Sequence, residues 1–157
     1  TLFRSHNITR FSQNTEVNSF SSKIICGECS RAFARKGWRT PSGDRKVWQR
    51  SKRYKVKGVL GCGNRHIYED TLIEIYLRAW NRLVECREML MPEWESKMQG
   101  DDLLARFRAM EFLEITRDAQ PLKELDIDLM LRTVNFIKVY ENGMVVTVFL
   151  DVTEIEC

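Results

Sequence analysis

Two thiols, Cys26 and Cys29, follow a short apolar stretch and enclose Gly27 and Glu28. Cysteines in this spacing can both bind one tetrahedral zinc ion, and the glycine permits the turn that aims them at it. A redox pair is the alternative. A thioredoxin-like site, however, needs its second cysteine inside a helix, and the residues after Cys29 are typical of a strand. The spacing therefore favours metal chemistry.

Further ligands are less regularly placed. Cys62, in a second glycine-flanked turn, is a candidate third ligand, and His66 could supply a nitrogen. A lone histidine beside an apolar residue is more often a core or surface residue, so both interpretations of His66 stay open. Cys86 falls in a predicted helix, where a small buried hydrophobic role is expected, and Cys157 is terminal.

Charge is distributed unevenly along the chain. Residues 1–68 carry 15 Lys and Arg against three Asp and Glu, whereas residues 69–157 carry 10 against 19. This asymmetry, with aromatics between the cations, favours contact with a polyanion such as nucleic acid over a merely solvated basic surface. The candidate DNA-binding residues are Arg35, Lys36, Arg39, Arg45, Lys46, Arg50, Lys52, Arg53, Lys55, Lys57 and Arg65.

Length and composition limit the class of protein. The chain has 157 residues, 43% of them hydrophobic, which is typical of a globular protein with one moderate core or two small modules. The chain has five cysteines, and this odd number predicts a reducing compartment and not a disulfide framework. No apolar run is long enough to span a bilayer. We expect a cytoplasmic protein. A sequence that begins at Thr1 is also expected to be a fragment of a longer one.

Short elements dominate the first half of the chain. Residues 1–20 are polar and aperiodic, typical of a linker or of the tail of a preceding domain. Strands are predicted around 23–26, 31–36 and 45–50, with a turn at 41–44. Three aromatic residues could pack the small core of such a ribbon or touch sugars: Trp38, Trp48 and Tyr54. Core packing is the commoner role of tryptophan in a module this small.

Helical periodicity begins at Glu69, where apolar residues recur every three or four positions. Pro92 is expected to stop or kink this helix at Met91. Asp101 is a candidate N-cap for a following helix. The helices between 69 and 132 lack sustained heptads, so we expect no long coiled coil.

Two alternating segments, 134–140 and 144–150, flank Asn142-Gly143, a strong signal for a β-hairpin. The predicted fold class is therefore α+β: a zinc-ribbon-like β module, several helices and a C-terminal β-hairpin. The predicted domains are 21–67 for the ribbon and 68–157 for a helical segment closed by a hairpin at 134–155.

Together these segments resemble the C-terminal zinc β-ribbon region of large serine recombinases, the resolvase/invertase-type integrases and transposases of phages and conjugative elements. The resemblance covers about residues 15–157. It is carried by residues 20–29, 35–36, 47–49, 62–67 and 69, and by 136–140, 147–151 and 153–155.

The resemblance implies DNA binding at the outer part of a recombination half-site, in a bacterial, nucleoid-associated protein that assembles with other recombinase subunits. The catalytic domain with its serine nucleophile would be separate. Arg50 stands where this family has a zinc-binding cysteine. Zinc is then retained with His66 or water in the vacant position, or lost, and Arg50 is expected to turn outward toward DNA.

No serine–histidine–carboxylate pattern or phosphate-binding glycine loop points to catalysis by this chain itself. The leading hypothesis is binding of double-stranded DNA for site-specific recombination, in DNA integration or excision of a mobile genetic element. The alternative is a protein-interaction or assembly module with an acidic helical docking surface. An enzyme with its own active site is a third hypothesis.

Overall fold

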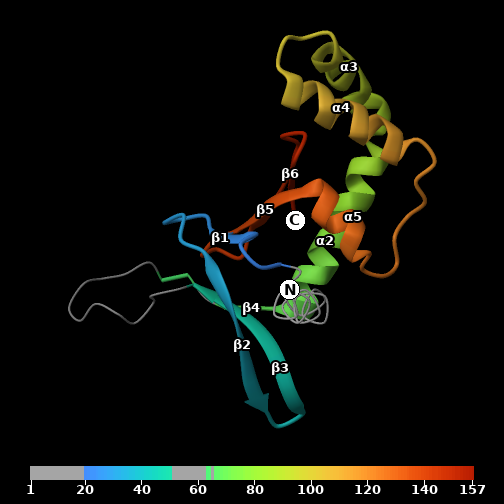
Figure 1. The fold of residues 1–157 in the computed structure, drawn as a ribbon. Helices are drawn as coiled ribbons and strands as arrows, with labels where there is room; N and C mark the ends of the chain where they lie inside the picture. The colour runs from blue at the N-terminus through green and yellow to red at the C-terminus, as the bar shows by residue number, and fades with distance from the viewer. Residues whose placement is uncertain (1–19, 51–62, 65) are drawn as a thin grey trace, which may run out of the picture.

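The computed structural model describes residues 20–50, 63–64 and 66–157. These residues form seven strands and four helices, which confirms the predicted α+β class. Figure 1 shows a hairpin that projects from one end of the molecule, a central sheet packed beside a long helix, and a pair of helices at the other end.

The projecting hairpin consists of β2 (Phe33–Thr40) and β3 (Gly43–Arg50), and the short strand β4 (Ile67–Tyr68) pairs with β3. All pairings are antiparallel, and the β2–β3 register runs unbroken from Thr40 opposite Gly43 to Phe33 opposite Arg50. Gly43 has a φ of +120°, which a side chain would strain. The predicted turn is confirmed, and both strands extend closer to it than the sequence indicated.

The central sheet has the order β1-β5-β6-β7, from strands at both ends of the described chain. β5 (Val134–Val139) and β6 (Val145–Phe149) form the predicted antiparallel hairpin, and β7 (Glu154–Glu156) adds an edge strand. β1 (Ile24–Cys26) pairs with β5 in parallel. This long-range pairing was not predicted, and it joins the two predicted domains in one sheet.

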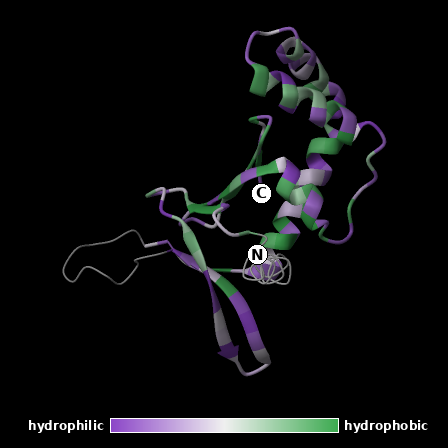
Figure 2. Cartoon of the chain, in the orientation of Figure 1, coloured by the Kyte–Doolittle hydropathy of each residue, from purple (hydrophilic) through white to green (hydrophobic). Residues whose placement is uncertain are grey.

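Helix α2 (Glu69–Glu85) follows β4 directly and packs its apolar face against both sheets. Figure 2 shows this helix coloured hydrophobic on part of its surface and hydrophilic on the rest. Phe20 and Trp48 from the ribbon belong to the same hydrophobic cluster as the helix. The expected core role is confirmed for Trp48, which is 1% exposed, but not for Trp38, which is partly exposed. Tyr54 lies outside the described residues. The buried residues of α2 are Leu72, Ile75, Tyr76, Ala79, Trp80 and Leu83.

The helical boundaries differ from those predicted. The chain bends at Cys86, half-buried between α2 and α3 (Arg87–Met98), and α3 continues through Pro92. The prediction of a helix end at Met91 is therefore wrong, because the break has already occurred at Cys86. Cys86 also lies outside the fully buried core, contrary to expectation.

Helix α4 (Leu103–Thr116) packs beside α3, and its N-cap is Asp102. The Asp102 carboxylate accepts hydrogen bonds from the amides of Leu104 and Ala105, so the predicted cap was one residue early. A short helix, α5 (Ile127–Thr133), begins at the cap Asp126 and leads into β5. None of the helices formed by the described residues is long and apolar enough to cross a membrane.

Candidate nucleic-acid interface and cysteine knuckle

The cysteine knuckle, residues 26–29, is a tight turn at the end of β1. The Cys26 amide donates to the Arg31 carbonyl at 2.8 Å, and the Ser30 amide donates back to the Cys26 carbonyl at 2.9 Å. The Gly27 amide donates to the carbonyl of Val139 on β5 at 2.8 Å. A Cβ atom on Gly27 would lie 2.5 Å from the Tyr140 ring, so the glycine permits this close approach.

The sulfur of Cys26 is fully buried beside the Asn64 side chain. Asn64 Nδ2 donates to Cys26 Sγ at 3.1 Å and to the Val139 carbonyl at 2.6 Å, and Asn64 is itself 1% exposed. The amide therefore ties the segment around Asn64 to the knuckle and to β5. This role was missed from the sequence, although an asparagine just after a glycine-flanked cysteine was visible there.

The sulfur of Cys29 has a cationic neighbour. Arg50 Nη1 lies 3.8 Å from Cys29 Sγ in donor geometry, and Arg50 is only 5% exposed. The prediction that Arg50 turns outward toward DNA is therefore wrong. Position 50 is opposite the buried Phe33 in the β2–β3 ladder, at the end of β3 where the residues of both faces are buried.

The other two predicted metal ligands are Cys62 and His66. Cys62 lies outside the described residues, so the predicted ligand set remains a prediction. The His66 ring stacks on Trp38 with centroids 4.3 Å apart and meets Tyr68 edge-on at 5.2 Å. Within the part of the chain that the structure describes, no group of three or more His, Cys, Asp or Glu residues could hold a metal ion.

The contacts around the knuckle do not fit a zinc centre. A structural zinc site needs four ligands, each with a lone pair directed at the metal. Here the guanidinium of Arg50 faces Cys29, and arginine remains protonated in proteins. A cation that can donate but not accept thus lies beside Cys29, and position 50 supplies no zinc ligand.

The predicted DNA-binding cations fall into three groups. Lys36, Arg39 and Lys46 are exposed on the hairpin, and Arg45 is half-buried. Arg35 is held by the helix, and Arg50 by the knuckle. The remaining predicted cations lie outside the described residues: Lys52, Arg53, Lys55, Lys57 and Arg65.

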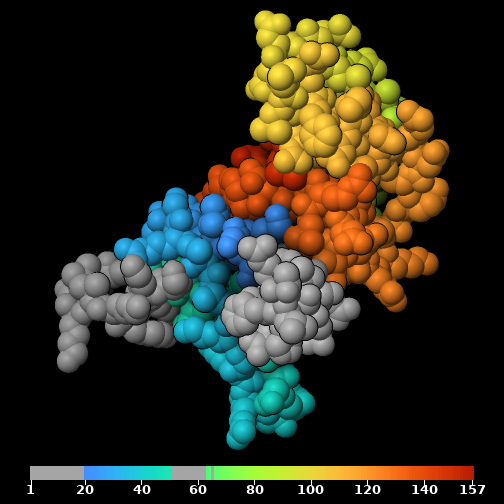
Figure 3. All heavy atoms as spheres, viewed as in Figure 1, coloured from blue at the N-terminus to red at the C-terminus, as the bar shows by residue number. Residues whose placement is uncertain are grey.

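The exposed cations occupy both faces of the hairpin. The register pairs Gly37 with Lys46 and Arg39 with Asp44, which places Lys46 and Arg39 on one face, while Lys36 is on the other. Figure 2 shows the outer half of the hairpin coloured hydrophilic, and Figure 3 shows it standing clear of the body.

An aromatic stack lies on the same face as Lys36. It begins at Trp38, continues through the ring of His66 to Tyr68, and ends at Arg45, whose guanidinium carbon is 3.6 Å from the centroid of the Tyr68 ring. All four side chains are partly exposed. The stack was missed from the sequence, because only the β3–β4 pairing places Tyr68 beside the hairpin.

Glu69 joins the hairpin to α2. Its carboxylate accepts from Arg35 Nε at 2.7 Å and from Arg35 Nη2 at 2.9 Å, and from the Trp48 indole at 3.3 Å. The hydrogen bonds from Arg35 to Glu69 raise the pKa of Arg35. Because Glu69 is in the first turn of α2, this ion pair fixes the angle at which the hairpin leaves the helix.

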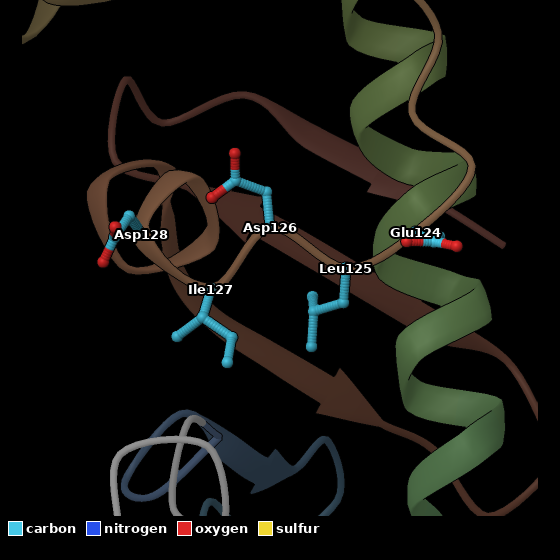
Figure 4. A pocket seen from close by; sticks show the side chains of 5 residues that line it. All are labelled: Glu124, Leu125, Asp126, Ile127 and Asp128. Atoms are coloured by element: carbon cyan, nitrogen blue, oxygen red, sulfur yellow. The ribbon is translucent and has the colours of Figure 1, made fainter. Parts of the chain in front are cut away.

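Two hollows lie away from the hairpin. One, at the start of α5, is lined by Glu124, Asp126 and Asp128 with two apolar residues, and Figure 4 shows the three carboxylates pointing in different directions. The other is a groove of about 280 Å³ on α4, lined by Met98, Leu103, Arg106, Phe107 and Met110. Neither brings together groups that could act jointly as acid, base and nucleophile.

Comparison with known proteins supports part of the sequence interpretation. Residues 19–81, about two fifths of the chain, match the family model of the recombinase zinc beta ribbon domain. This confirms the resemblance over the ribbon and the start of α2, and indicates a recombinase-associated module there. No curated protein and no solved structure matches the chain.

Proposed function

We propose that this chain binds double-stranded DNA at recombination half-sites, as the C-terminal part of a serine site-specific recombinase with a separate catalytic domain. The activity served would be integration or excision of a mobile element, in an assembly with other recombinase subunits. The observation that carries the proposal is a projecting β-hairpin with exposed cations on both faces.

The dimensions of the hairpin suit a DNA groove. A two-stranded ribbon fits the major groove of B-DNA, which is about 12 Å wide. Each eight-residue strand spans roughly 27 Å at about 3.4 Å per residue. With Lys36 on one face and Arg39 and Lys46 on the other, a hairpin lying in the groove can neutralise phosphates of both DNA strands.

The rigidity of the hairpin base supports the same function. The bidentate pair between Arg35 and Glu69 and the stack from Trp38 to Arg45 hold the hairpin against α2 and β4. A fixed base reduces the ordering cost on binding. The stack also presents partly exposed aromatic rings beside Lys36, which suits contact with sugars or bases.

The test is a titration of the chain with a fluorescent duplex between 50 and 200 mM salt. One variant replaces three hairpin cations with alanine: Lys36, Arg39 and Lys46. A matched control replaces three exposed cations outside the hairpin: Arg106, Arg117 and Lys123. If each hairpin cation meets one phosphate, the hairpin variant should reduce the slope of log K against log salt by about 2.7, or about 0.9 per contact.

The wild-type chain with about six phosphate contacts should lose roughly 10³-fold in affinity over this salt range, and the hairpin variant only about 40-fold. The control should behave as wild type, because its three cations lie outside the hairpin. Both variants lose the same net charge, so a difference between them reports on the hairpin itself. Equal effects of the two variants would show that overall charge, and not the hairpin, drives binding. Binding that ignores salt would refute the electrostatic account.

A protein-interaction module is the second candidate function. It is favoured by the exposed apolar residues of α4: Leu103, Leu104, Phe107 and Met110. Large exposed apolar side chains grouped on one helix are typical of an interaction surface. Concentration-dependent association in sedimentation experiments, without affinity for duplex DNA, would favour this candidate over the first.

A further inference from the structure

Both sulfurs of the cysteine knuckle already have side-chain N–H donors. Cys29 Sγ faces Arg50 Nη1 at 3.8 Å, and Cys26 Sγ faces Asn64 Nδ2 at 3.1 Å. The two donor residues are 5% and 1% exposed, so they are part of the protein interior and not surface groups that lie nearby by chance. Arg50 is on β3, and Asn64 is in the segment before β4.

The backbone fixes the position of the guanidinium. Arg50 is the last residue of β3, and the unbroken ladder with β2 sets it opposite Phe33, which is 3% exposed. A strand side chain cannot change faces without a one-residue slip, and such a slip would also move the buried Trp48 to the other face. The contact between Arg50 and the knuckle is therefore a consequence of the register of the hairpin.

Arg50 cannot take the part of a metal ligand beside Cys29. A zinc–sulfur bond of about 2.3 Å would place the metal no more than about 6 Å from Arg50 Nη1. The guanidinium of Arg50 stays protonated and has no lone pair, so position 50 offers zinc no ligand and instead places a cation beside the thiol of Cys29. What the guanidinium does supply is a hydrogen bond to the sulfur of Cys29.

We propose that the guanidinium of Arg50 replaces the zinc ion of the ribbon. Arg50 and Asn64 hold the knuckle by hydrogen bonds to Cys29 and Cys26, so that this ribbon folds without metal. The inference concerns how the ribbon is stabilised, and it stands whether or not the hairpin binds DNA.

The first experiment measures zinc content and melting temperature of the full chain, purified from cells grown with added zinc. We expect much less than one zinc per chain, and a melting temperature that a zinc chelator leaves unchanged. About one zinc per chain, with a fall in melting temperature on chelation, would overturn the proposal, because metal-dependent ribbons unfold when the metal is removed.

The second experiment measures the alkylation rate of Cys29 by peptide mapping of the wild-type chain, with and without chelator. Cys29 is exposed, so it should react at the same rate in both cases. Zinc-bound thiolate would be protected until the chelator removed the metal. An increase in the Cys29 rate on chelation would refute the proposal, even if every Arg50 variant failed to fold.

Variants of Arg50 test whether the guanidinium stabilises the knuckle. Arg50→Met keeps the length of the side chain and removes its charge and donors, and we expect a lower melting temperature. The exposed Arg31 next to the knuckle provides a matched control, and Arg31→Met should melt as wild type does. An Arg50→Met protein that melts as high as wild type would show that the guanidinium is dispensable.

Discussion

The ion pair between Arg35 and Glu69 should contribute more stability than its surface counterparts, because it joins the ribbon to helix α2. The guanidinium and carboxylate meet through two hydrogen bonds, at 2.7 and 2.9 Å, and Trp48 donates to the same carboxylate at 3.3 Å. A double-mutant cycle of Arg35→Met, Glu69→Gln and the combined variant would isolate the pairwise energy.

The expected magnitude follows from burial. Both side chains are 18% exposed, so solvent screens their attraction only in part. Hydrogen bonds to charged groups contribute about 1.5–3 kcal/mol each before the cost of desolvation, which leaves a net coupling of about 1–2 kcal/mol. The pair Glu74–Arg78 provides the control: it is 3.9 Å apart, 68% and 72% exposed, and should couple by about 0.3–0.5 kcal/mol.

Urea unfolding of both sets of variants at 25 °C gives the two coupling energies. In melting experiments, each kcal/mol of lost stability should lower the melting temperature of a chain of this length by about 2–4 °C. Added salt should reduce the coupling of the surface pair more than that of the Arg35–Glu69 pair. A coupling at Arg35 and Glu69 no larger than at the control pair would refute the view that this contact anchors the ribbon.

Two further substitutions test the packing of the knuckle. Gly27→Ala should destabilise the protein by about 1–3 kcal/mol, because the new Cβ would lie 2.5 Å from the Tyr140 ring. Gly37→Ala is the control and should be nearly neutral, because only the flexible end of a lysine side chain is near. Equal urea midpoints for the two variants would contradict this packing. Asn64→Ala should cost about 1–3 kcal/mol, because it removes the donor to a buried sulfur and a buried carbonyl. The control is Asn135→Ala, because Asn135 is exposed. If the Asn64 variant unfolds at the same urea concentration as this control, the amide of Asn64 does not stabilise the knuckle.

Local signals in the sequence predicted the two hairpins well. Alternating residues beside a turn at Pro41 and at Asn142-Gly143 define strands whose partners are adjacent in the chain, so little besides turn chemistry is needed to place them. The parallel pairing of β1 with β5 joins residues more than 100 positions apart. No local pattern specifies such a partner, because it depends on how α2 packs the whole core.

The helix boundaries show the same limit on a smaller scale. Proline is a strong local signal, yet Pro92 lies inside α3, and the break at Cys86 has no comparable mark in the sequence. Packing decides here: Trp94 of α3 is buried with its indole donating to the Asp151 carboxylate at 2.7 Å. A favourable tertiary contact of this kind can outweigh the single backbone hydrogen bond that proline removes.

Position 50 shows what a sequence can and cannot reveal about a site. The sequence indicates that Arg50 stands where a thiol is expected, and long cations are mostly solvated, so an outward side chain was the reasonable expectation. The strand register overrides that preference, since position 50 faces inward whatever residue occupies it. An inward side chain must find partners for its charge within the fold, and the sulfur of Cys29 is one acceptor near this guanidinium. The register thus places a cation beside a thiol of the knuckle, inside the segment that matches the zinc beta ribbon family model.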